Sequence, residues 1–220
     1  MIANKETYLA EIFGILKKEW PCNRTVNIVC HGHSVPAGYF KTPIVDMFNS
    51  YPHLLHRELK AYYPYSVINV IVTAIGGEAS DKGAERFERD VLAYRPDIVT
   101  IDYALNDRNI GLEKACSSWA LMIENALSKD IKVILLSPTG DLTSNLNDPN
   151  DLLNKHAGQI YDLASKYQTG LADSLTSFKR YIKTGGSLED LMSQGNHPNR
   201  KGHELVSKEI IEWFNPSGNF

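Results

Sequence analysis

The sequence predicts a three-layer α/β/α sandwich, in which helices cover both faces of a parallel sheet. Two observations predict it: short apolar runs rich in Val and Ile recur along the 220 residues, and a stretch with helical periodicity separates each run from the next. Strands that alternate with helices in this way are joined by right-handed crossovers. The length suits one domain of this class, so we expect residues 1–220 to fold as a single domain.

Runs of β-branched residues bounded by Gly or Pro mark the strands. The first expected strand covers residues 26–29 and is broken by Gly32, and the second covers residues 67–72, between Pro64 and Gly76. Three further runs follow the same rule, the last of them short: residues 97–103, 131–136 and 170–173.

Apolar residues three and four positions apart mark the helices. In the N-terminal helix this face comprises Leu9, Ile12, Phe13, Leu16 and Trp20, and the helix is expected to end near Pro21. The same spacing recurs in five later stretches: residues 47–63, 80–92, 112–126, 153–167 and 205–213.

Composition excludes several classes of function. With 43% hydrophobic residues, 22% charged residues and a net charge of −3, the chain offers no positive field to attract nucleic acid. Charged residues interrupt its first twenty positions, unlike a signal peptide, and no apolar run approaches the ~20 residues that span a bilayer. Three cysteines without ligand-like spacing suit reduced thiols. We therefore expect a cytoplasmic protein with no nucleic-acid partner and no membrane span.

Polar or glycine-rich signals follow three of the expected strands. They are Ser34 after the first strand, the pair Gly76-Gly77 after the second and the pair Asn106-Asp107 after the third, while residues 194–199 precede the last helix. Each alone also fits an ordinary turn or helix cap. Because parallel strands end at a common edge, where open α/β sheets place their chemistry, their occurrence in order predicts one site there.

These residue types fit acyl transfer through a serine. A serine nucleophile needs a base to take its proton, and the tetrahedral intermediate needs preorganised donors for its oxyanion. His197 is the candidate base. The candidate donors are the backbone N–H groups of Ser34 and Gly77 and the side-chain amide of Asn106.

The order of these four blocks resembles the SGNH hydrolase family, also called GDSL-type esterases and lipases, over residues 26–213. The resemblance implies a flavodoxin-like sheet of five parallel strands in the order 2-1-3-4-5, and no metal or organic cofactor. It also implies a role for each matching residue: Ser34 as nucleophile and backbone oxyanion donor, Gly77 as backbone oxyanion donor, Asn106 as side-chain oxyanion donor and His197 as general base.

Two positions depart from the family pattern. His33 stands where the family usually has Asp before its serine, and Gln194 stands where it usually has Asp three residues before its histidine. The carboxylate that orients the histidine is therefore missing from its expected position, and we expect a slow Ser34–His197 dyad. Whether a backbone carbonyl or the amide of Gln194 orients the ring stays open. Two acidic residues lie nearby but occupy no family position: Glu189 and Asp190.

We expect the substrate to be a small ester, either an O-acetyl group on a sugar or a similar short acyl chain. Four side chains are expected to line an acyl slot or a sugar platform: Tyr39, Phe40, Met47 and Tyr103.

Three alternatives stay open. Gln194 also fits a catalytically weakened or non-catalytic, carbohydrate-binding member of the same fold. A flavodoxin-like nucleotide binder is disfavoured because the Gly76-Gly77 loop lacks the lysine that holds phosphates. His31 and His33 have the spacing of metal ligands on an extended segment, but no third ligand accompanies them.

Overall fold

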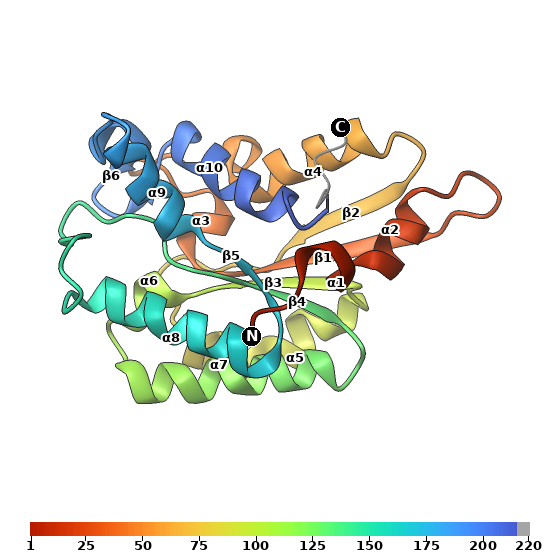
Figure 1. Cartoon of the computed structure of the whole chain (residues 1–220), viewed down its shortest axis with the longest axis horizontal. Helices are drawn as coiled ribbons and strands as arrows, with labels where there is room; N and C mark the ends of the chain where they lie inside the picture. The colour runs from red at the N-terminus through yellow and green to blue at the C-terminus, as the bar shows by residue number, and fades with distance from the viewer. Residues whose placement is uncertain (215–220) are drawn as a thin grey trace.

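The computed structural model describes residues 1–214 and contains the expected parallel sheet at its centre (Figure 1). Its strand order is β2-β1-β3-β4-β5, which confirms the predicted order. The strands of this sheet are β1 (Thr25–Gly32), β2 (Val67–Val72), β3 (Ile98–Asp102), β4 (Lys132–Leu136) and β5 (Gly170–Ala172).

The first strand is longer than the sequence indicated, because both of its edges are paired. β1 pairs with β2 from Thr25 to Cys30 and with β3 from Ile28 to Gly32. Gly32 is therefore the last residue of the strand, and its partner in β3 is Asp102. A Cβ atom at Gly32 would lie 2.5 Å from the carbonyl oxygen of Asp102, so this close approach requires glycine.

Helices cover both faces of the sheet, as predicted (Figure 1). Successive side chains of β4 alternate between the two cores: Ile134 and Leu136 face one, and Val133 and Leu135 face the other. The helices of the first layer are α4 (Tyr51–Tyr62), α9 (Ser174–Lys183) and α10 (Arg200–Ile211). Those of the second are α5 (Ser80–Asp90), α7 (Leu112–Leu127) and α8 (Leu152–Tyr167).

The N-terminal helix differs from the prediction. It forms two short helices, α1 (Lys5–Tyr8) and α2 (Ala10–Leu16), and so ends well before Pro21. Trp20 is 84% exposed and packs on no core, because the polar residues 17–19 separate it from the buried face of α2. Helix α9 was not predicted.

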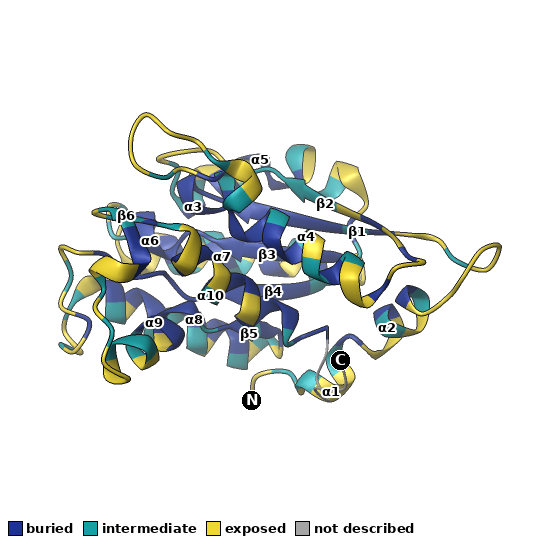
Figure 2. Ribbon diagram, turned by 90° about the horizontal axis from the view of Figure 1, so that it is seen from above, coloured by how far each residue is buried: buried dark blue, intermediate teal, exposed yellow. Residues whose placement is uncertain are grey.

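Short elements cluster where the central strands end. They are α3 (Ser34–Ala37), α6 (Ala104–Asp107), the antiparallel hairpin of β6 (Met192–Gln194) and β7 (His197–Pro198), and two 3₁₀ helices, η1 (Met47–Asn49) and η3 (Glu189–Leu191). A further 3₁₀ helix, η2 (Leu92–Tyr94), precedes β3 at the opposite edge. Figure 2 shows that β1, β3 and β4 are buried, whereas exposed loops surround the region of α3, α6 and β6. The candidate site is therefore built from short elements on a rigid sheet.

Candidate active site

Ser34 lies at the carboxyl edge of the sheet, as the first residue of α3. It follows β1 after one intervening residue and is 5% exposed. The end of β2 runs beside it, since the backbone N–H of Ile75 donates to the carbonyl of Gly32 over 3.0 Å. The strand ends thus bring the Gly76-Gly77 loop and α6 to the same edge as Ser34.

The C-terminal hairpin places His197 against Ser34. The distance from Ser34 Oγ to His197 Nε2 is 3.0 Å, although 163 residues separate the two in sequence. Burial lowers the pKa of the half-buried His197 imidazole, while a hydrogen bond to the Phe40 carbonyl opposes this shift. The neutral ring, which can accept a proton from the serine, is therefore the favoured form near neutral pH.

A backbone carbonyl contacts the histidine nitrogen that the carboxylate of a serine triad would bind. The carbonyl oxygen of Phe40 lies 3.0 Å from His197 Nδ1 and can accept its proton. The side chain of Phe40 is held by stacking on the buried ring of His203, with centroids 5.1 Å apart. Of the two groups considered from the sequence, this geometry favours the main-chain carbonyl as the one that orients the ring.

The amide of Gln194 faces the same nitrogen. Its oxygen accepts a hydrogen bond from the backbone N–H of Thr42 at 2.9 Å, and because that N–H can only donate, the amide nitrogen must point the other way. The nitrogen lies 2.8 Å from His197 Nδ1. Gln194 can therefore bond only the tautomer with a proton on Nε2, which cannot take a proton from Ser34, whereas Phe40 favours the working tautomer.

The candidate oxyanion donors lie at the same edge of the sheet as Ser34. Gly77 has a φ of +78°, a left-handed conformation that favours glycine, and a Cβ atom there would meet open space. Within residues 1–214, no protein acceptor binds the backbone N–H of Gly77 or of Ser34. The side-chain amide of Asn106 donates to the carbonyl of Glu78 over 2.9 Å, which leaves its second N–H for a ligand.

A buried network, which we call the Glu78 network, fixes the loop that carries Gly77. Glu78 pairs with Arg86 of α5 and accepts a hydrogen bond from the hydroxyl of Tyr103 at 2.8 Å. The Tyr103 hydroxyl also lies 3.1 Å from His31 Nε2. Burial lowers the pKa of His31 to about 3, so this imidazole is neutral.

Asp107 holds the N-terminus of α5. Its carboxylate accepts from the backbone N–H of Ser80 at 2.7 Å and from the indole N–H of Trp119 at 2.6 Å. Burial raises the pKa of this carboxyl group. Of the pair 106–107, the first residue therefore faces the site and the second has a structural role.

The four expected substrate-binding side chains lie in different environments. Tyr39 and Met47 are 39% and 44% exposed beside the site, and the ring of Tyr39 packs over Gly76. The half-buried Phe40 contributes its carbonyl rather than an open ring face. Tyr103 is fully buried in the Glu78 network, which corrects the expectation that it lines the substrate pocket.

Sequence reasoning missed two features of the site. The role of Phe40 depends on a main-chain atom, which leaves no mark in the sequence. The second feature is Asp102, whose carboxylate lies 3.3 Å from His33 Nε2 beside Ser34. The sequence signal that could have identified Asp102 was its position as the last residue of a buried strand. Among residues 1–214, no cluster of three His, Cys, Asp or Glu side chains could hold a metal ion.

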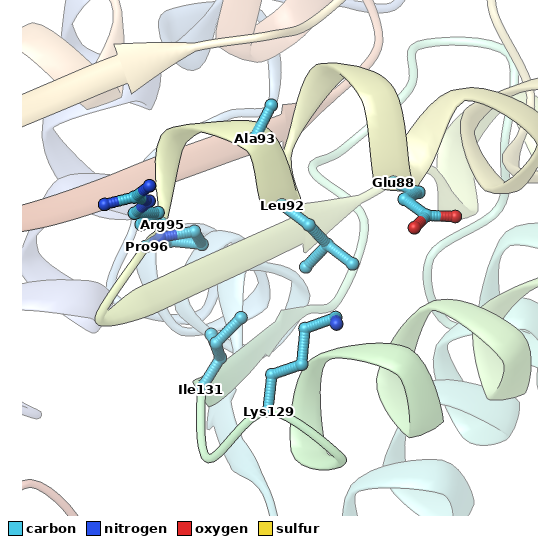
Figure 3. Close-up of a pocket in the computed structure, with 7 residues that line it drawn as sticks. All are labelled: Glu88, Leu92, Ala93, Arg95, Pro96, Lys129 and Ile131. Carbon is cyan, nitrogen blue, oxygen red and sulfur yellow. The ribbon is translucent and has the colours of Figure 1, made fainter.

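One cavity lies at the opposite edge of the sheet. Figure 3 shows a pocket of about 520 Å³ near the starts of β3 and β4. Seven residues line it: Glu88, Leu92, Ala93, Arg95, Pro96, Lys129 and Ile131. It therefore lies at the amino edge of the sheet, whereas Ser34 lies at the carboxyl edge. Every helix within residues 1–214 is too short or too polar to cross a membrane.

Comparison with solved structures finds the same fold in carbohydrate esterases. An acetylxylan esterase from Geobacillus stearothermophilus superposes with a TM-score of 0.74 at 19% identity, covering 86% of this chain and 93% of its own. A two-domain esterase active on acetylated mannans gives a TM-score of 0.77 at 20% identity, covering 97% of this chain and 53% of its own. The mannan esterase has also been co-crystallised with mannopentaose.

Comparison with curated protein sequences found no match. A model of the GDSL-like lipase/acylhydrolase family, however, matches residues 30–205, which include every strand-end motif described above. This match confirms the resemblance seen in the sequence. The chain belongs to the GDSL-like lipase/acylhydrolase family and is an SGNH-type serine esterase.

Proposed function

We propose that this esterase removes an O-acetyl or other short acyl group from a carbohydrate through an acyl-enzyme on Ser34. The observation that carries the proposal is the 3.0 Å contact between Ser34 Oγ and His197 Nε2 beside unpaired backbone donors. The acetylated xylan and mannan substrates of the structural neighbours support a sugar acetate as the substrate class.

The first half-reaction attaches the acyl group to Ser34. The Ser34 oxygen attacks the ester carbonyl while its proton passes to His197 Nε2. The N–H groups of Ser34, Gly77 and Asn106 stabilise the oxyanion. The intermediate collapses when His197 returns the proton to the leaving sugar oxygen.

The second half-reaction releases the acyl group. His197 takes a proton from water, the hydroxide attacks the acyl carbonyl, and the Ser34 oxygen leaves as it regains a proton. The exposed Tyr39 and Met47 are the side chains that we propose for contact with the sugar. The three cysteines are unpaired, which supports a reducing, cytoplasmic location as part of the proposal.

The position of Gln194 favours a second candidate, a carbohydrate-binding protein without turnover, because its amide opposes the working tautomer of His197. A substrate panel separates the two functions. Wild type and Ser34→Ala should be compared on p-nitrophenyl acetate, butyrate and octanoate and on acetylated xylo- and manno-oligosaccharides.

Acetate release by wild type that disappears in Ser34→Ala is the result we expect. Saturable oligosaccharide binding by calorimetry, equal in both proteins and without acetate release, would support the binding protein instead.

A further inference from the structure

A second imidazole lies against the hydroxyl of Ser34 from the buried side of the site. His33 is 1% exposed, and its Nδ1 lies 3.4 Å from Ser34 Oγ. Its Nε2 lies 3.3 Å from a carboxylate oxygen of Asp102, whose side chain is 4% exposed. Ser34 is thus flanked by two imidazoles, and only the buried one contacts a carboxylate.

The surrounding groups define where the proton of a neutral His33 ring lies. The backbone N–H of Val35 donates to His33 Nδ1 at 3.4 Å, so this nitrogen presents a lone pair. The proton is then on Nε2, which faces the Asp102 carboxylate. The Val35 N–H and the Ser34 hydroxyl share this lone pair, each at 3.4 Å. An acceptor nitrogen at the serine and an N–H toward a carboxylate are the connections that a serine triad requires.

Register between neighbouring strands builds this arrangement. Asp102 is the last residue of β3 and pairs with Gly32, so its side chain lies beside the residue that follows β1. The groups around the pair come from several elements. Asp107 and His197 interact electrostatically with His33, the ring of Tyr103 lies 6.5 Å from its ring, and Tyr51 and Cys30 interact with the charge of Asp102.

The two imidazoles are suited to different steps. His197 is half-buried and can reach both the leaving group and water, but it lacks a carboxylate partner. His33 has the carboxylate but is enclosed, so it can reach only the serine. We propose that His33, backed by Asp102, is a second general base for Ser34. This inference rests on the proposed function of the same site.

The step that His33 supports is acylation by an ester whose leaving group needs no proton. The Ser34 O–H bond breaks, its proton binds His33 Nδ1, and the serine oxygen forms a bond to the acyl carbon. The bond from that carbon to p-nitrophenolate then breaks, and the phenolate leaves with the electron pair. His33 retains the proton as an imidazolium paired with the Asp102 carboxylate. Deacylation requires a base that reaches water, and His33 does not.

The test uses His197→Ala, in which His33 is the remaining imidazole at Ser34. With p-nitrophenyl acetate, this variant should release one equivalent of nitrophenolate in a burst and retain one acetyl group on Ser34, identified by intact-mass and peptide analysis. The burst rate should rise with pH and level off once the imidazole is deprotonated. Ser34→Ala/His197→Ala supplies the background acetylation.

Two further variants in the His197→Ala background assign the base. General-base assistance contributes ~10²–10⁴-fold, so His33→Gln and Asp102→Asn should each slow the burst by at least about 10²-fold. His156→Gln is the matched control, because His156 of α8 is an equally buried imidazole that does not contact Ser34. Its burst should equal that of His197→Ala alone. Circular dichroism and thermal unfolding establish that each variant is folded.

Absence of the Ser34 adduct in His197→Ala, while wild type turns over, would overturn the inference and leave the proposed function standing. A burst rate that rises tenfold per pH unit without levelling would also overturn it, because hydroxide rather than His33 would be the base. This pH profile decides the matter even when His33→Gln fails to fold. Wild type that releases no acetate would contradict the proposed function, and the inference with it.

Discussion

The site has two sides, one built at the ends of β1, β2 and β3 (the strand-end side) and one built from the β6–β7 hairpin (the hairpin side). Side chains hold the strand-end side, whereas main-chain atoms hold much of the hairpin side. On the first side, the Glu78 network and Asp107 fix the loop of Gly77 and the start of α5 through buried charges. On the second, His197 is oriented by the carbonyl of Phe40 and by a neutral amide. In the proposed mechanism, this difference makes oxyanion stabilisation the stronger half of catalysis and base activation the weaker half.

The largest effect is expected at Asn106, on the strand-end side. Loss of one oxyanion donor typically lowers kcat by ~10²–10³-fold, and Asn106→Ala should fall in that range with unchanged circular dichroism. Asn109→Ala is a matched control because Asn109 is exposed one turn away. If Asn106→Ala turns over short acyl esters at the wild-type rate, the amide has only a structural role.

Glu78→Gln tests whether buried charge holds the strand-end side. Arg86 is 8% exposed and would lose its buried anionic partner, keeping only the more distant Asp90 at 3.4 Å. Breaking a buried ion pair in this way should lower the free energy of unfolding by about 3 kcal/mol. Urea unfolding measures the change. Glu85→Gln removes a solvent-exposed pair with Lys82 and should have far less effect. Equal stability of the two variants would contradict the assigned importance of the Glu78 network.

The pH profile tests the hairpin side. Burial lowers the pKa of His197 below its ordinary value of 6.5, so the imidazole remains a neutral base to lower pH than a free histidine. The value of kcat/KM for acetate release should therefore rise with pH to a plateau, with a midpoint below pH 6.5. A midpoint above pH 6.5 would show that an anion supports the imidazolium after all.

Three buried histidines limit the pH range of that measurement. The pKa values of His31 and His203 are lowered to about 3 and that of His156 to about 4. The unfolded chain therefore binds protons below pH 6.5 that the folded chain binds only at these lower pH values. The free energy of unfolding should consequently fall as pH decreases across this window, by about 1.4 kcal/mol per pH unit for each histidine. Thermal unfolding at each pH separates this loss from the titration of His197.

The same contrast explains how much the sequence could predict. β-branched runs predicted the strands, and the polar residues at their ends predicted Ser34, Gly77 and Asn106 at one edge, because strand order and direction place those ends together. The orientation of His197 could not be predicted, since it depends on the main chain of Phe40, 157 positions away.

Pairing between strands accounts for two further differences. Asp102 faces His33 only because β3 ends in register with Gly32 of β1. Tyr103 was expected in the pocket but turns into the buried network, where Gly83 leaves room for its ring. The alternation of side chains between the two faces of a strand does not extend reliably to the residue that follows the strand, here Tyr103.

Substitution of Gln194 tests most directly whether His197 works without a carboxylate. Glu has the length of Gln, so Gln194→Glu can keep the bond from the Thr42 N–H and place its second oxygen 2.8 Å from His197 Nδ1. A carboxylate there fixes the working tautomer and stabilises the imidazolium, and kcat should rise by about tenfold or more. Gln194→Ala should change kcat by less than about threefold, because Phe40 remains to orient the ring.

Steady-state kinetics of acetate release by wild type, Gln194→Glu and Gln194→Ala provide the measurement. A faster Gln194→Glu with a nearly unchanged Gln194→Ala is the predicted result. A Gln194→Glu variant no faster than wild type, or a Gln194→Ala variant as impaired as His197→Ala, would contradict the assignment of the Phe40 carbonyl as the group that orients the base.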